Sequence, residues 1–254
     1  MSLSDYASFY INLDTSTARR AEIEAELQAA GIVDAQRISA FDGRGVDLST
    51  LEDCDLAKAY RYLGRPLKGG EYGCYRSHLA MMDAFLQTDR RYGLVFEDDA
   101  AIDPKVMEVL DEVVALLEAR GLAWDVVHIS AGLLKIYSKI GDVGQGRELM
   151  KSHYFSMQTT GLLWSREGAR HFTHNHRRIW MPIDTMLRYV ETRRGRGFAV
   201  WRALVTPSGA ISEIDGDGRQ RKQRGRSWFY GLAKQKRLWS DKFVAVVGKL
   251  RFRA

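Results

Sequence analysis

The chain has 254 residues, of which 45% are hydrophobic and 28% are charged, and this composition is typical of a folded globular protein. Its net charge of +6 is unevenly distributed: residues 219–254 hold twelve Lys or Arg against one acid and carry +11, which leaves −5 on residues 1–218. These values exclude a disordered chain and place the positive charge in a C-terminal tail, where we expect it to contact a partner.

The N-terminus and the cysteines indicate the cellular compartment. The first residues show no basic region followed by an apolar one, so we expect no signal peptide, and no apolar run has the length of a membrane span. The two cysteines, Cys54 and Cys74, are too few for a disulfide framework, and neither lies in a CxxC pair typical of zinc or redox sites. We therefore expect a protein of the reducing cytoplasm.

Hydrophobic spacing in the first hundred residues predicts strands that alternate with helices. A strand at 9–13 leads through the polar run 14–16, which suits a helix cap, into a helix that ends at Gly31. A polar, turn-rich stretch covers residues 44–70. The other elements predicted in this part are strands at 36–40 and 93–96 and helices at 51–62 and 75–86.

The second half of the chain continues this alternation. Pro104 can occupy the first turn of a helix whose apolar stripe is unbroken until Gly121. Residues 132–153 have the composition of a loop. The other elements predicted here are strands at 124–129 and 155–164, a helix that begins near Ser165 and a helix at 185–189.

Strands separated by helices are typical of an α/β domain with a mostly parallel sheet flanked by helices on both faces. We expect one such domain in residues 1–218 and a basic, aromatic, amphipathic tail in residues 219–254. In open sheets of this type, ligands bind beyond the carboxyl ends of the strands. Residues that follow predicted strands are therefore the first candidates for a site.

Three consecutive acids, Glu97, Asp98 and Asp99, directly follow the apolar strand at 93–96. Strand alternation sends Glu97 and Asp99 to one side and Asp98 to the other, so that two carboxylates converge where ligands are expected. Carboxylate oxygens suit Mg²⁺ or Mn²⁺, which would neutralise the charge of a departing diphosphate. The alternative is that the acids cap the next element or lie in solvent.

Separated segments carry a more specific signal than the acids alone. The segments are Tyr10-Ile11-Asn12-Leu13-Asp14 with Arg19-Arg20, Ala40-Phe41-Asp42-Gly43, 70–78, Phe96-Glu97-Asp98-Asp99, 160–169 and Pro182-Ile183-Asp184. In wording, order and spacing they resemble glycosyltransferase family twenty-five, the family of bacterial lipooligosaccharide galactosyltransferases. The resemblance covers residues 6 to 215.

This resemblance implies a GT-A fold, which is Rossmann-like, and a UDP-sugar donor, commonly UDP-galactose. It further implies a divalent metal, Mn²⁺ or Mg²⁺, held by Glu97 and Asp99, and inversion at the anomeric carbon. The acceptor is expected to be a lipooligosaccharide or another envelope glycan. The alternative is a module of the same fold that binds a nucleotide or a glycan without catalysis and is tethered to the membrane.

The resemblance also implies a set of donor-binding residues. Arg19 falls near the first strand-to-helix turn, where a helix N-terminus also favours phosphate, although it could instead be a solvated helix charge. A neutral His78 can bind a metal or a sugar hydroxyl, although a lone histidine is more often structural. The donor-binding residues expected are Asn12, Leu13, Arg19, Ser77, His78 and Asp98.

Inverting transfer needs a general base that deprotonates the acceptor hydroxyl. We assign this role to Asp184, because a proline two residues earlier and a break before the helix at 185–189 should expose it at a loop. Aspartate also suits the N-cap of that helix, which is the structural alternative. Asp125, Glu213 and Asp215 are competing candidates for the base.

The tail combines cationic and aromatic residues. Five basic residues lie between Arg219 and Arg226, and apolar residues from Trp228 to Leu250 are interleaved with further Lys and Arg. This pattern favours an anionic membrane surface, to which each basic residue contributes about 1 kcal/mol, so we expect peripheral attachment to the inner face of the cytoplasmic membrane. A helix packed on the domain with solvated charges is one alternative, and a nucleic-acid surface is the weaker one.

Overall fold

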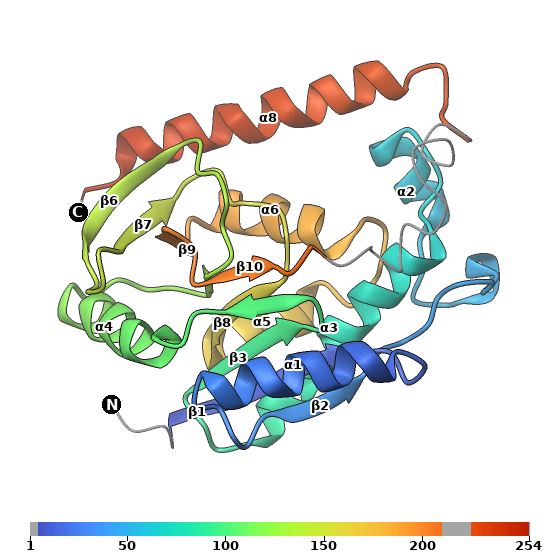
Figure 1. The fold of residues 1–254 in the computed structure, drawn as a ribbon. Helices are drawn as coiled ribbons and strands as arrows, with labels where there is room; N and C mark the ends of the chain where they lie inside the picture. The colour runs from blue at the N-terminus through green and yellow to red at the C-terminus, as the bar shows by residue number, and fades with distance from the viewer. Residues whose placement is uncertain (1–4, 210–224, 254) are drawn as a thin grey trace.

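A computed structural model describes residues 5–209 and 225–253, and an eight-stranded sheet forms its centre (Figure 1). The strand order is β2-β1-β3-β8-β5-β9-β7-β6. The strands of this sheet are β1 (Tyr6–Asn12), β2 (Gln36–Ser39), β3 (Tyr92–Glu97), β5 (Val126–His128), β6 (Tyr137–Asp142), β7 (Glu148–Ser152), β8 (Gly161–Ser165) and β9 (Gly197–Trp201). A second sheet pairs β4 (Ala100–Ile102) with β10 (Val205–Pro207).

Helices cover both faces of the large sheet, and each face has its own hydrophobic core. Leu94 and Phe96 of β3 share one core with the apolar faces of two helices, whereas Val95 between them belongs to the other core. This arrangement confirms the predicted α/β fold. The first core includes α1 (Thr17–Ala29) and α4 (Val106–Ala119); the second includes α2 (Leu56–Leu63), α3 (Gly69–Gln87), α5 (Arg166–Asn175) and α6 (Ile183–Arg194).

The sheet is mostly parallel in strand direction. β1 pairs in parallel with β2 and β3, and β5 pairs in parallel with β9. β8 lies between β3 and β5 and runs antiparallel to both, so the five other strands named here share one direction. Because Ile11 lies opposite Glu97, β1 and β3 end at the same edge of the sheet.

Residues 132–153, predicted as a loop, contain a β-hairpin instead. β6 and β7 pair antiparallel, and β7 joins them to the sheet through β9. The turn uses Gly144, Gln145 and Gly146, all with positive φ. Only Ile140 of β6 is buried, so this strand lacks the apolar alternation by which a half-buried strand is recognised.

The strand predicted at 155–164 is shorter, because β8 begins only at Gly161. At Phe155 and Met157, in the segment before β8, the backbone contacts side chains rather than a neighbouring strand. The Phe155 N–H donates to Thr192 Oγ1 at 3.2 Å, and His128 Nε2 lies 3.3 Å from the Met157 carbonyl oxygen. Phe155 is buried and the apolar strand β8 follows closely, so sequence alone could not locate where the strand begins.

Helix α3 begins at Gly69, six residues before the start predicted at Tyr75. Its first turns are rich in glycine, which usually weakens a helix. These glycines let the segment that follows β2 pack directly against the helix backbone. A Cβ built on Gly73 would lie 2.3 Å from the Phe41 carbonyl oxygen, and one on Gly69 would lie 1.9 Å from that of Gly43.

A long C-terminal helix, α8 (Tyr230–Arg251), lies along α6 and α2 (Figure 1). Arg193 of α6 forms an ion pair with Asp241 at 2.8 Å, and Arg237 donates to the Tyr62 carbonyl oxygen at 2.6 Å. The boundary predicted at residue 218 falls in 210–224, outside the described residues. Of the helices in the described part, none has the length and apolarity required to cross a bilayer.

Candidate functional site

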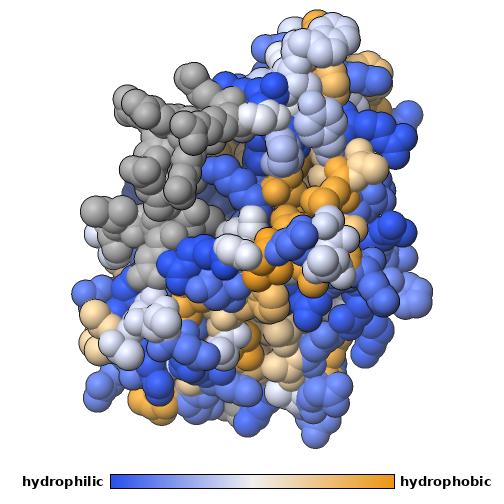
Figure 2. Space-filling view, turned by 90° about the vertical axis from the view of Figure 1, so that its right-hand side faces the viewer, coloured by the Kyte–Doolittle hydropathy of each residue, from blue (hydrophilic) through white to orange (hydrophobic). Residues whose placement is uncertain are grey.

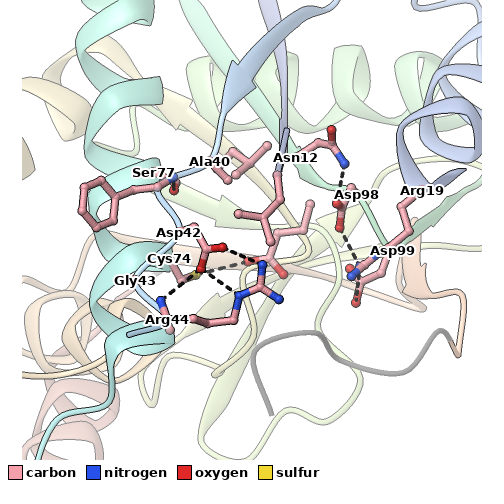
Figure 3. A pocket seen from close by; sticks show the side chains of 15 residues that line it. Asn12, Arg19, Ala40, Asp42, Gly43, Arg44, Cys74, Ser77, Asp98 and Asp99 are labelled. Carbon is pink, nitrogen blue, oxygen red and sulfur yellow. Dashed lines mark hydrogen bonds and ion pairs between the residues drawn. The ribbon is translucent and has the colours of Figure 1, made fainter. Parts of the chain in front are cut away.

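A cavity opens at the edge where β1 and β3 end, between α1 and the start of α3 (Figure 3). Figure 2 shows the molecule from the side of this edge, with hydrophobic side chains between hydrophilic ones. The cavity matches the position expected for a ligand in an open α/β sheet. Its lining residues are Ile11, Asn12, Leu13, Arg19, Ala40, Phe41, Asp42, Gly43, Arg44, Gly70, Cys74, Ser77, Glu97, Asp98 and Asp99.

The three acids all line this cavity, but they do not alternate as predicted. β3 ends at Glu97, and Asp98 and Asp99 form a turn before β4, so strand geometry no longer determines where they point. Arg19 lies 2.6 Å from an Asp98 carboxylate oxygen and 3.8 Å from one of Asp99. The Asn12 amide donates to the other Asp98 oxygen at 2.7 Å, which ties the end of β1 to the acidic turn.

Asp99 is the least neutralised of the three acids. Burial raises the pKa of its carboxyl group, and the nearby charges of Glu97 and Asp98 raise it further, against the opposing effect of Arg19. One Asp99 carboxylate oxygen is buried and has no hydrogen-bond partner among the described residues. An unpaired, buried anionic oxygen is costly, so this position favours a cation as a ligand.

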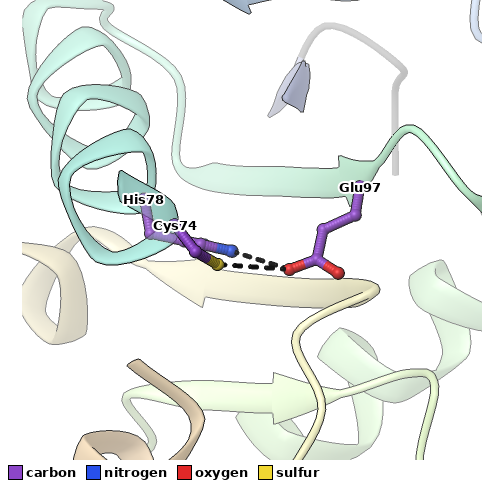
Figure 4. Close-up of side chains that lie close together, drawn as sticks. All are labelled: Cys74, His78 and Glu97. Atoms are coloured by element: carbon purple, nitrogen blue, oxygen red, sulfur yellow. Dashed lines mark hydrogen bonds and ion pairs between the residues drawn. The ribbon is translucent and has the colours of Figure 1, made fainter. Parts of the chain in front are cut away.

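Glu97 points toward α3, where it meets Cys74 and His78 (Figure 4). Its Oε1 lies 3.2 Å from His78 Nε2 and 3.8 Å from Cys74 Sγ, and it also accepts a hydrogen bond from Thr159. Burial opposes ionisation of Glu97, but the contacts with His78, Thr159 and Cys74 outweigh it and lower the pKa. Figure 4 shows the second Glu97 oxygen turned away from His78 and Cys74.

Ser77 fixes the wall of the cavity opposite the acids. Its hydroxyl donates to the Gly73 carbonyl oxygen at 2.7 Å and accepts from the Phe41 N–H at 2.9 Å. Next to this anchor, Arg44 contacts both carboxylate oxygens of Asp42, at 2.8 and 2.6 Å. The segment from Phe41 to Arg44 is therefore held against α3 and shapes the cavity.

The structure brings most of the donor-binding residues expected from sequence to this one cavity. Asn12, Leu13, Arg19, Ser77 and Asp98 line it. His78 is fully buried behind Glu97 and does not line the cavity. It therefore acts on the cavity only through its contact with the Glu97 carboxylate.

Asp184 lies within the first turn of α6 and not in an exposed loop, because α6 begins at Ile183, two residues before the predicted start. Its carboxylate accepts from the Thr185 N–H at 2.5 Å, and burial raises its pKa. Asp184 is close enough to Cys74 to raise the pKa of that thiol, although it does not line the cavity.

None of the competing base candidates lines the cavity among the residues that the structure describes. Asp125 is fully buried and forms ion pairs with Arg194 and Arg196 at the opposite edge of the sheet, before β5. Glu213 and Asp215 lie outside the described residues.

Cys74 and Thr159 both contact Glu97, and sequence reasoning predicted a site role for neither. Cys74 has no CxxC partner, yet it precedes His78 by four residues, and that spacing places both on one face of a helix. This spacing was the available signal. Thr159 contacts Glu97 from an irregular segment, and no local pattern indicates that contact.

Comparison with known proteins gives a family match. Residues 6–187 match the model of glycosyltransferase family 25, described as LPS biosynthesis protein. The chain is 25% identical to procollagen galactosyltransferase 2 of Homo sapiens over 218 residues, which are 79% of this chain and 34% of the relative. It is 27% identical over 167 residues to a probable inactive glycosyltransferase 25 family member 3 of Bos taurus, covering 64% of this chain and 27% of the relative.

The chain spans about a third of the length of the curated relatives it matches. Among solved structures it is similar to a glycosyltransferase involved in the glycosylation of the major capsid of PBCV-1. That similarity has a TM-score of 0.39 at 10% identity and covers 92% of this chain and 98% of the other.

Proposed function

This chain belongs to glycosyltransferase family 25, and on that premise we propose that it transfers a hexose from a UDP-sugar to a glycan acceptor. Galactose is our choice of sugar, because relatives are named galactosyltransferases. A lipooligosaccharide or another envelope glycan is our choice of acceptor, because the family is described by LPS biosynthesis. The observation that carries the proposal is the cavity in which three carboxylates and Arg19 meet the end of β1.

A divalent cation fits the acidic turn. The Asp99 oxygen that has no partner among the described residues and the second Glu97 oxygen are available, and the three carboxylates of residues 97–99 outnumber the Arg19 guanidinium beside them. We propose Glu97 and Asp99 as ligands for Mn²⁺ or Mg²⁺, because hard carboxylate oxygens suit these ions. When bound, such an ion neutralises the charge of a departing diphosphate.

Cys74, His78 and Glu97 offer a second arrangement for a metal. Their ligand atoms all lie within 4.8 Å of one another. Ligands held about 2.0–2.3 Å from a tetrahedral zinc ion are about 3.3–3.8 Å apart, and the contacts of 3.2 and 3.8 Å to Glu97 are close to this spacing. Since both arrangements use Glu97, replacing Asp99 or Cys74 separately distinguishes them.

The nucleotide diphosphate is assigned to the N-terminal side of α1. Arg19 lies in the first turn of this helix and reaches the acidic turn, so its guanidinium can bind a phosphate oxygen without leaving the cavity. Helix N-termini add a favourable field for anions. Asn12 holds Asp98 in place, and the anchored Phe41–Arg44 wall faces the same space.

Asp184 remains our proposal for the base that accepts the proton of the acceptor hydroxyl. Burial raises the pKa of its carboxyl group, which makes the carboxylate a stronger proton acceptor. Asp125 is a weaker choice, since its carboxylate is committed to Arg194 and Arg196.

A non-catalytic module of the same fold is the second candidate function. The observation in its favour is that relatives from Bos taurus and Rattus norvegicus are named probable inactive members of the family. Such a module would bind a UDP-sugar or a glycan in the same cavity without releasing UDP.

We also propose that α8 attaches the protein to an anionic membrane, at the cytoplasmic leaflet where such lipids gather. One side of α8 packs on the domain, as expected for the alternative of a packed helix with solvated charges. Its other side, however, exposes apolar residues at helical spacing, and basic residues lie among them. An exposed stripe of this kind suits insertion at the lipid headgroup level. The exposed residues are Leu232, Trp239, Phe243, Val246 and Leu250, with Trp228 just before the helix.

The test is UDP release from UDP-galactose in the presence of Mn²⁺ and a lipooligosaccharide acceptor. Asp99→Asn should abolish release and Asp184→Asn should reduce kcat, while Asp142→Asn, a control on the exposed β6 strand, should leave both unchanged. Binding of UDP-galactose without any release by the unmodified chain would favour the non-catalytic module. Full turnover by Asp99→Asn would overturn the metal assignment.

A further inference from the structure

A second cavity lies where α8 crosses α2 and α6, away from the acidic turn. Three helices from distant parts of the sequence contribute basic side chains to it, and none of these residues takes part in the proposed transfer. The residues relevant here are Arg61 of α2, Arg193 of α6, and Lys236, Arg237, Ser240 and Asp241 of α8.

The cavity has an excess of positive charge. Asp241 is the one acid among the described residues that line it, and Arg193 pairs with it at 2.8 Å. Arg61, Lys236 and Arg237 have no acidic hydrogen-bond or ion-pair partner within the part of the chain that the structure describes. Among the described residues, four cations and one acid thus surround one space, and this excess of positive charge costs free energy through mutual repulsion unless an anion enters.

Arg237 is the most firmly positioned of the three cations that lack an acidic partner among the described residues. Its guanidinium donates to the Tyr62 carbonyl oxygen at 2.6 Å and lies 5.3 Å from the centre of the Tyr62 ring. Burial lowers its pKa, so its surroundings do not yet stabilise the charge fully. An anionic oxygen in the cavity would supply the missing stabilisation, with the Ser240 hydroxyl as a further donor.

The cavity borders the exposed apolar stripe of α8. Lys236 follows Leu232 by four residues and precedes Trp239 by three, so it is a neighbour of both on the helix surface. Leu232 is 69% exposed and Trp239 is 70% exposed. A membrane that accepts these side chains would therefore bring its headgroups to the mouth of the cavity.

We propose that this cavity binds the phosphate group of an anionic lipid whose headgroup is a phosphate monoester or a diphosphate. The excess positive charge of the described lining residues matches two negative charges on one group better than the single charge of a phosphodiester. This inference rests on the proposed membrane attachment of α8 and does not depend on the transferase activity. In this proposal α8 both attaches the protein to the membrane and helps to select lipids by their headgroups.

The test compares vesicles of equal surface charge. The full chain is sedimented with phosphatidylcholine vesicles that contain either phosphatidic acid or enough phosphatidylglycerol to match its charge. Wild type should bind the phosphatidic acid vesicles at least tenfold more tightly. The double variant Arg61→Gln, Lys236→Gln should lose this preference, while Lys234→Gln, Lys242→Gln, which removes the same charge from α8 surface outside the cavity, should keep it.

The possible outcomes distinguish the headgroup site from the membrane attachment of α8 on which it rests. Equal binding to the two vesicles by wild type, or a preference that survives in the cavity variant, would overturn the headgroup site but leave membrane attachment standing. Binding to neither vesicle would overturn both. If inorganic phosphate bound to the wild-type protein in calorimetry while the protein showed no preference between the two vesicles, the cavity would be a site for free phosphate, and the lipid assignment would be wrong.

Discussion

Replacing Gly73 by alanine tests how the cavity wall is built. An added Cβ would lie 2.3 Å from the Phe41 carbonyl oxygen and 3.0 Å from the Gly43 nitrogen, whereas ordinary contacts begin at 3.4 Å. The wall must therefore move by about 1 Å, although Ser77 holds Phe41 in place. Such overpacking lowers the free energy of unfolding by about 1–3 kcal/mol, and the better helix propensity of alanine offsets up to about 1 kcal/mol of this loss.

We expect Gly73→Ala to lower the Tm by about 2–8 °C, from a net loss of about 1–2 kcal/mol. It should also weaken UDP-sugar binding, since the displaced segment lines the cavity. Gly231→Ala is the matched control: it makes the same change in α8, where a Cβ meets nothing within 4 Å, and should leave the Tm equal or higher. Thermal unfolding and calorimetric titration with UDP measure both effects. A Gly73→Ala protein with wild-type Tm and affinity would refute the reasoning.

Three further predictions concern single side chains. Ser77→Ala leaves the Phe41 N–H without its acceptor and should cost about 1–2 kcal/mol, while steady-state kinetics should show a raised KM for the donor more than a lowered kcat. Asp125→Asn breaks a buried ion pair and should cost about 3 kcal/mol in urea unfolding, with kcat per folded molecule unchanged; a lost kcat would restore Asp125 as a base candidate. Burial lowers the pKa of His128 to about 4, so its contribution to stability is complete above about pH 6.5 and is lost as the pH falls toward 4. Urea unfolding should show that the free energy of unfolding of His128→Gln falls by about 1 kcal/mol less than that of wild type between pH 6.5 and 5.5. An equal fall in the two proteins would contradict this pH dependence.

Sequence reasoning succeeded where one local pattern determines the structure. The unbroken apolar stripe of α4 and the apolar run of β3 are buried as their periodicity predicts. The carboxyl end of β3 was correctly expected to face a cavity, because parallel strands that end together create one. Family resemblance then placed Asn12 and Arg19 in the same cavity, which their local sequence alone could not do.

The failures have physical causes that act across the fold. The glycines that begin α3 read as helix breakers, but tertiary packing against Phe41 and Gly43 requires them. β6 is an edge strand with one buried residue, so the spacing of its apolar residues does not predict its pairing with β7. The meeting of Cys74 with Glu97 depends on how α3 crosses the end of β3, which no spacing in the sequence specifies.

Binding of Mn²⁺ in the presence of UDP, followed by electron paramagnetic resonance, tests most directly whether the acidic turn holds a divalent ion. The account predicts that wild type binds Mn²⁺, that Asp99→Asn loses this binding, and that Cys74→Ser retains it, because Asp99 has the buried oxygen without a partner among the described residues. Undiminished binding by Asp99→Asn, or no binding by wild type, would contradict it.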